Sequence, residues 1–142
     1  MDLKSIFHDV KVSVQVMKSA DDETLTGVGV DMAGYEGVAF IASALKGEVA
    51  AFSMKAQQDT DSAYGTAADL LGTATAFADA VDSDAVCVLD IHQPRERYVR
   101  PVVTVPNWTA KPVSVIAIQY GAREVPVGNA GEFHQSPAEG TA

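Results

Sequence analysis

The first strong pattern in this chain is Val10-Lys11-Val12-Ser13-Val14-Gln15-Val16-Met17. Valine occupies every second position, and a polar residue separates each pair. A period of two in a segment rich in β-branched residues is typical of a strand with one buried face. We therefore expect the four valines to point into a hydrophobic core and the polar residues to face solvent.

Similar segments follow at intervals of about ten to twelve residues. The further predicted strands are residues 25–32, 38–45, 49–57, 86–91, 98–105 and 113–120. Lys46-Gly47 is typical of a hairpin turn between the second and third of these, and the last two are expected to pair with each other. No long helix is available to connect parallel strands. The pattern predicts an all-β protein, an antiparallel β-sandwich or jelly-roll-like barrel of about seven to eight strands.

Residues 62–81 carry two competing patterns. Apolar residues recur there at helical spacing, at positions 63, 67, 70, 74, 77 and 81. The same stretch contains Gly65, Gly72 and three threonines, all poor helix formers. We interpret it as short strands and loops, with a single helix as the alternative.

A chain of 142 residues suits one domain. The strand pattern is confined to residues 10–123, the predicted sandwich. Residues 1–9 and 124–142 lack it, so we expect extended N- and C-terminal arms that can order against a neighbouring subunit. The first residues do not form a secretory signal, and no apolar run approaches the roughly 20 residues that span a bilayer. We therefore expect synthesis in the cytoplasm and no membrane partner.

The net charge of −9 argues against direct binding of nucleic acid, which needs a basic surface. Residues 1–94 carry five lysines against fifteen acidic residues, whereas residues 95–142 carry five basic against four acidic residues. All four arginines lie in that last third. If they share a face, the resulting field can orient docking onto a partner.

The most pointed polar feature is the run Arg95-Glu96-Arg97-Tyr98-Val99-Arg100. Strict alternation would place Arg95, Arg97 and Val99 on one face and Arg100 on the other. One interpretation is an interface patch whose guanidinium groups pair with carboxylates of another protein. The other is pairing with acidic residues of this chain.

Trp108 lies in the proline-flanked loop of residues 106–112. It is either a lid over one end of the core or an exposed anchor of the kind common at interface hot spots. The candidate interface residues are therefore Arg95, Arg97, Arg100 and Trp108.

We find no pattern typical of a catalytic, cofactor or metal site. The three histidines are far apart in the sequence, at positions 8, 92 and 134. Cys87, the single cysteine, excludes an internal disulfide and is expected to be a small buried hydrophobe. Acidic clusters at residues 21–23, 59–61 and 79–84 lack the spacing of a twelve-residue calcium loop, so we interpret them as solvated turns.

Three segments together resemble a family of small structural proteins of tailed-bacteriophage virions. Residues 30–38 form a strand with a glycine–aromatic–acid corner, residues 57–64 carry a strand into an acidic turn, and residues 94–103 lead into the closing strands. The order and spacing resemble those of the family over roughly residues 10–126.

The resemblance implies a non-enzymatic virion protein, in particular a decoration (cement) protein that binds the outer capsid surface and stabilises the head. It implies the major capsid protein and further copies of this chain, as a homotrimer, as partners. It implies synthesis in the bacterial host cytoplasm and supplies no cofactor or catalytic residue.

Two alternatives stay open. One is a head–tail connector or a tail- or fibre-associated component, which only its ring or fibre assembly would distinguish. The other is a carbohydrate-binding sandwich, for which one Trp and four Tyr offer little stacking surface.

Overall fold

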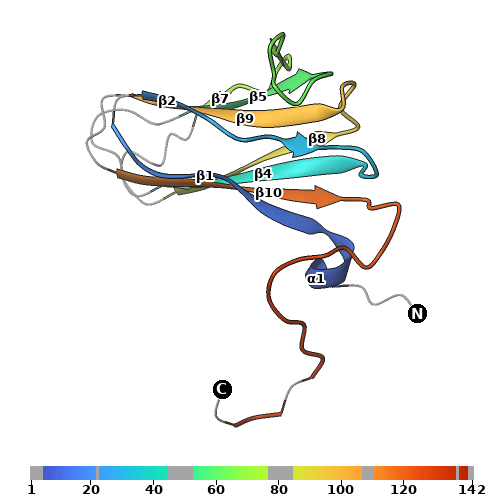
Figure 1. The fold of residues 1–142 in the computed structure, drawn as a ribbon. Helices are drawn as coiled ribbons and strands as arrows, with labels where there is room; N and C mark the ends of the chain where they lie inside the picture. Colours follow the sequence, from blue (N-terminus) through green and yellow to red (C-terminus); the bar gives the residue numbers. More distant parts are fainter. Residues whose placement is uncertain are drawn as a thin grey trace.

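The computed structural model describes residues 5–21, 23–44, 53–76, 85–106, 111–136 and 138–140. These residues form two antiparallel sheets of four and six strands. The sheets face each other across one hydrophobic core (Figure 1), so the predicted β-sandwich is confirmed.

The four-stranded sheet, here called sheet A, has the spatial order β1 (Lys11–Ala20), β10 (Lys111–Tyr120), β4 (Gly37–Ala44) and β8 (Ala85–His92). The six-stranded sheet B is centred on β9 (Tyr98–Val105) and β5 (Ser53–Asp59). Its short outer strands are β2 (Glu23–Thr26) and β3 (Val30–Asp31) beside β9, and β6 (Ala68–Asp69) and β7 (Thr75–Ala76) beside β5.

The strand pairing differs from the prediction. The expected hairpin between β4 and β5 is wrong, since β4 pairs with β10 and β8 in sheet A, whereas β5 pairs with β9 in sheet B. The expected pair of β9 and β10 is wrong for the same reason, because these strands also belong to different sheets. Each strand has an apolar face, and crossing to the opposite sheet lets consecutive strands bury those faces against each other.

The core lies between the two sheets. Sheet A contributes Phe40, the largest fully buried side chain among the described residues, together with Val115, and sheet B contributes Met54 and Val103. Along β4 the buried residues alternate with half-buried ones, as expected for a strand that has one face on the core.

Strand β1 confirms the predicted strand but contradicts the predicted orientation of its valines. Val12 and Val14 are 39% and 51% exposed, whereas Gln15 and Val16 are buried. The register of β1 against β10 shifts between Val14 and Val16, so Gln15 is the extra residue of a β-bulge. The bulge turns Gln15 inward, where its Oε1 accepts a hydrogen bond from the backbone N–H of Gly29 at 2.7 Å.

Residues 62–76 form short strands and loops, as interpreted from the sequence, and residues 77–81 lie outside the described part. The Asp59 carboxylate organises this region. It accepts hydrogen bonds from the backbone N–H groups of Asp61 at 3.0 Å and Thr66 at 2.8 Å, and from the Thr66 hydroxyl. Asp59 is also buried. The interpretation of residues 59–61 as a solvated turn is therefore wrong for this residue.

We expect stability to depend on pH through Asp59. The backbone N–H of Asp61, followed by the Thr66 groups, holds the pKa of this carboxyl below its ordinary value of 3.8. A lowered pKa means that the ionised carboxylate stabilises the folded state above pH 3.8, and that this contribution is lost as the pH falls through the folded-state pKa. Asp59→Asn should lower the melting temperature at pH 7 and flatten its acid dependence.

Thermal unfolding between pH 2 and 7 checks this prediction, with Asp69→Asn as the control. Asp69 is an exposed carboxylate paired with Lys55, and such pairs contribute little to stability. Equal melting temperatures for the two variants would contradict the role assigned to Asp59.

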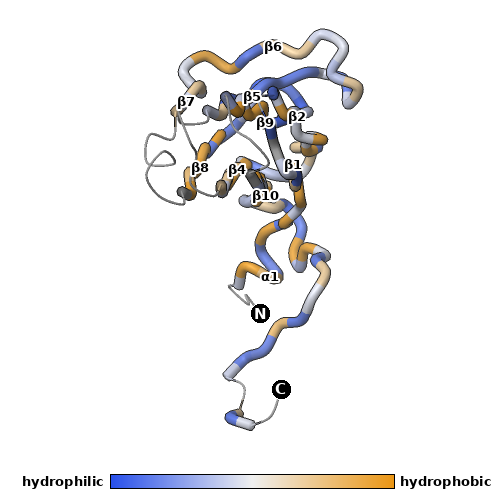
Figure 2. The backbone as a smooth tube through the Cα atoms, turned by 90° about the vertical axis from the view of Figure 1, so that its left-hand side faces the viewer, coloured by the Kyte–Doolittle hydropathy of each residue, from blue (hydrophilic) through white to orange (hydrophobic). Residues whose placement is uncertain are grey.

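The two terminal segments contact each other. The N-terminal segment contains one helical turn, α1 (Ile6–Asp9), rather than a fully extended arm. The Asn129 side chain accepts a hydrogen bond from the Val12 backbone N–H and donates to the carbonyl oxygens of Phe7 and Val10. Beyond it, residues 130–136 are exposed and lead away from the sandwich on the side of sheet A (Figure 2).

Candidate interaction site

Three loops meet at the end of the sandwich where β8 and β10 end and β4 and β9 begin. They span residues 32–36, 93–97 and 121–124. Backbone hydrogen bonds join them: the Arg123 N–H donates to the Gly34 carbonyl at 2.9 Å, and the Gln93 N–H donates to the Glu36 carbonyl at 2.7 Å. Gly34, with φ of +86°, makes the first loop turn sharply enough for these contacts.

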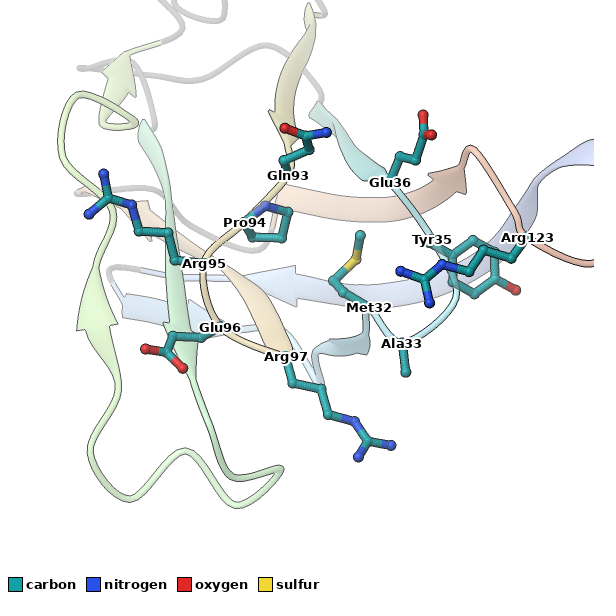
Figure 3. Close-up of a pocket in the computed structure, with 10 residues that line it drawn as sticks. All are labelled: Met32, Ala33, Tyr35, Glu36, Gln93, Pro94, Arg95, Glu96, Arg97 and Arg123. Atoms are coloured by element: carbon teal, nitrogen blue, oxygen red, sulfur yellow. The ribbon is translucent and has the colours of Figure 1, made fainter.

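The loops enclose an open cleft of about 530 Å³, here called the loop cleft (Figure 3). Its lining residues are Met32, Ala33, Tyr35, Glu36, Gln93, Pro94, Arg95, Glu96, Arg97 and Arg123. Because the loops are joined through their backbones, the cleft is formed before any partner arrives.

Arg97 is paired within the chain. Its Nε and Nη2 donate to the two carboxylate oxygens of Asp31, each at 2.9 Å. The guanidinium group lowers the pKa of the Asp31 carboxyl. For Arg97 the structure therefore favours the interpretation of pairing with the chain's own acids.

Arg95 and Arg123 differ from Arg97, since neither side chain has a hydrogen-bonding or ionic partner among the residues that the structure describes. Both side chains are exposed. Arg95 also lines a second hollow beside the loop cleft, and Arg123 lines a third, so each side chain lies between two hollows at this end of the sandwich. Two carboxylates, Glu36 and Glu96, line the same cleft. This mixture of charges fits a protein surface that carries both signs better than it fits the uniform charge of nucleic acid.

Arg100 lies outside the loop cleft. Its guanidinium carbon lies 4.5 Å from the ring centroid of Tyr64, and the group donates two hydrogen bonds to Gln57 Oε1. The alternation predicted for residues 95–100 is wrong, because residues 93–97 form a loop and Val99 is fully buried in β9. Trp108 lies outside the described residues.

Sequence reasoning missed Arg123 and Tyr35 as members of this site. The sequence shows residues 34–37 as a glycine–aromatic–acid corner, but no nearby sequence pattern indicates that this corner contacts residue 123. The connection is made by the Gly34–Arg123 backbone hydrogen bond and by the pairing of β4 with β10.

Other reactive groups are dispersed over the part of the chain that the structure describes. In that part, no three His, Cys, Asp or Glu side chains gather in a way that could hold a metal ion. Cys87 packs against the core, and burial raises the pKa of its thiol. None of the described helices has the length and apolar character needed to cross a bilayer.

Neither a protein-family model nor a curated protein matches this sequence. Among solved structures, the chain is similar to the crystal structure of PBSX exported protein XepA, with a TM-score of 0.59 at 13% sequence identity. The similarity covers 91% of this chain and 44% of XepA, so the chain spans less than half the length of that protein. At this identity the likeness shows a shared fold.

Proposed function

We propose that this chain is a non-enzymatic structural protein of a tailed-phage virion, and specifically a decoration protein that binds the outer capsid surface and stabilises the head. The partner is the major capsid protein. A decoration protein acts by mass action, since surface buried between it and the shell stabilises the assembled state. Many copies on a symmetric shell make a modest interface sufficient.

The observation that carries the proposal is the preformed loop cleft with two arginines, Arg95 and Arg123, that lack side-chain partners among the described residues. An exposed guanidinium is well suited to bidentate contacts with carboxylates on another protein. The shared fold with a phage-derived exported protein and the three sequence segments that resemble virion proteins support the same function.

The test is mass spectrometry of purified phage particles that carry either the wild-type chain or the double variant Arg95→Glu/Arg123→Glu. For the wild type we expect a copy number on the order of the capsid subunits. For the variant, the lost charge-assisted contacts should reduce bound copies by at least about tenfold at moderate salt. Raised salt should weaken attachment of the wild type, because screening acts on exposed charges.

A variant with the same charge change, Lys18→Glu/Lys55→Glu, serves as the control. Both lysines pair with acids on the sandwich surface, away from the loop cleft, and this variant should attach like the wild type. A copy number of about a dozen or fewer would favour a connector or tail component. Absence from the particle would refute a virion function.

A further inference from the structure

The outer face of sheet A is apolar across all of its strands. The central row, read through the register from β1 to β8, is Val14–Ile116–Ile41–Val88. The outer two valines are 51% and 56% exposed. On either side lie the rows Val12–Ile118–Ala39–Asp90 and Met17–Ser114–Ser43–Val86. The bulge in β1 produces this face, because it leaves Val12 and Val14 outside while turning Gln15 in.

The few polar groups of these rows already have hydrogen-bonding partners within the chain. The hydroxyl groups of Ser43 and Ser114 lie 2.7 Å apart and form a hydrogen bond. Asp90 is the one ionisable side chain in the three rows, and its carboxylate accepts a hydrogen bond from the Tyr120 hydroxyl at 2.7 Å. Apart from the Asp90 carboxylate at one edge, covering the face therefore leaves few unpaired polar groups, which keeps the cost of desolvation low over the rest of the face.

The central row reads the same in both directions, as Val–Ile–Ile–Val. A two-fold axis parallel to the strands, between β10 and β4, sets Val14 opposite Val88 and Ile116 opposite Ile41 of a second copy. The same axis sets Met17 opposite Val86, and these side chains are 71% and 69% exposed. Such self-complementarity is what an isologous interface requires.

The area is sufficient for such an interface. Sheet A has four strands, and β4 and β8 are eight residues long. With strands about 4.8 Å apart and a rise of about 3.3 Å per residue, the whole face has a flat area of about 500 Å² per copy. Two copies together remove on the order of 1,000 Å² from water, the lower bound for a specific interface. A chain of net charge −9 repels its copies least where a face is nearly uncharged.

We infer that the outer face of sheet A is the interface with a second copy of this chain, packed sheet to sheet about a two-fold axis. Helix α1 and the C-terminal segment lie on the outer side of sheet A at its Lys11 end (Figures 1 and 2), where the Asn129 side chain accepts a hydrogen bond from the backbone N–H of Val12. In the two rows further along the strands, Val14 and Val88 are 51% and 56% exposed, and Met17 and Val86 are 71% and 69% exposed. This inference does not depend on the proposed function, since it concerns a different surface from the loop cleft.

The test measures mass in solution by light scattering and sedimentation, up to about 100 µM, which exceeds the dissociation constants of most specific interfaces. The wild type should form dimers. Val14→Lys and Val88→Glu should each raise the dissociation constant at least about 100-fold, because each buries an unpaired charge. The combined variant Val14→Lys/Val88→Glu should recover dimers, since each lysine then faces a glutamate of the other copy.

Val28→Lys is the matched control, because Val28 is an exposed valine outside this face and should leave the dimer unchanged. Within one copy Val14 and Val88 lie three strands apart, about 14 Å, so recovery cannot arise inside a single chain. A monomer at every concentration, a trimer, or a dimer that survives both single substitutions would overturn the inference. A variant that loses capsid attachment but keeps dimers, or loses dimers but keeps attachment, shows that the dimer interface and the capsid interface fail independently.

Discussion

Gly29→Ala should destabilise the protein by about 4 kcal/mol. Gly29 has φ of +89°, a conformation that costs a residue with a Cβ about 1–2 kcal/mol. A Cβ at this position would also lie 2.6 Å from Cζ and 2.8 Å from Cε2 of Tyr64. That ring is buried beneath Arg100, so it cannot move aside without breaking the packing of the 59–66 loop. Urea unfolding monitored by circular dichroism measures the loss.

Gly34→Ala separates the two causes. Gly34 has nearly the same φ, +86°, yet no atom lies within 4 Å of the position its Cβ would take. This variant should lose only the backbone contribution, about 1–2 kcal/mol. If both variants lost the same amount, steric conflict with Tyr64 would have no part in the result.

Phe40→Ala should cost about 3–5 kcal/mol. Phe40 has no solvent exposure and fills the space between the two sheets, so its removal forfeits transfer free energy and leaves a cavity. The next residue, Ile41, lies on the outer face of sheet A and is half-buried. Ile41→Ala should cost about 1 kcal/mol, because only part of its side chain leaves water on folding.

Both variants are compared by urea unfolding at low protein concentration, where association of copies adds least to the measured stability. The contrast tests the register of β4, since a shift of one residue would exchange the faces of Phe40 and Ile41. A larger loss for Ile41→Ala than for Phe40→Ala would refute the register.

The sequence was informative about where strands lie because period-two patterning is a local property. Residues 98–105 were predicted as a strand and form β9 with the same bounds. Which strands pair with each other was not predictable in this way. Two strands that are consecutive in the sequence and have apolar faces can form a hairpin or lie in opposite sheets, and the choice depends on how all the strands pair. The β1 bulge was hidden too, since nothing in the valine pattern marks Gln15 as the inserted residue.

The candidate site was predicted only in part, for a similar reason. Arg95 and Arg97 lie at the loop cleft because residues 93–97 leave the sheet together. Arg100 departs from them because β9 has begun and the pleat directs it toward Tyr64. Arg123 joins the cleft from a distant part of the chain through a backbone hydrogen bond that no periodicity reveals.

The bulge in β1 also has an evolutionary consequence. If Gln15 were deleted, Val14 and Val16 would still meet Ile116 and Val115, so the ladder would close without a gap. What would be lost is the side chain that holds the Gly29 backbone beside the Tyr64 ring, and a glycine is required at position 29 only while the backbone is held there. Among related sequences, an alignment gap at position 15 should therefore coincide with replacement of the glycine at 29 and of the aromatic residue at 64. The three positions should be inherited as one unit.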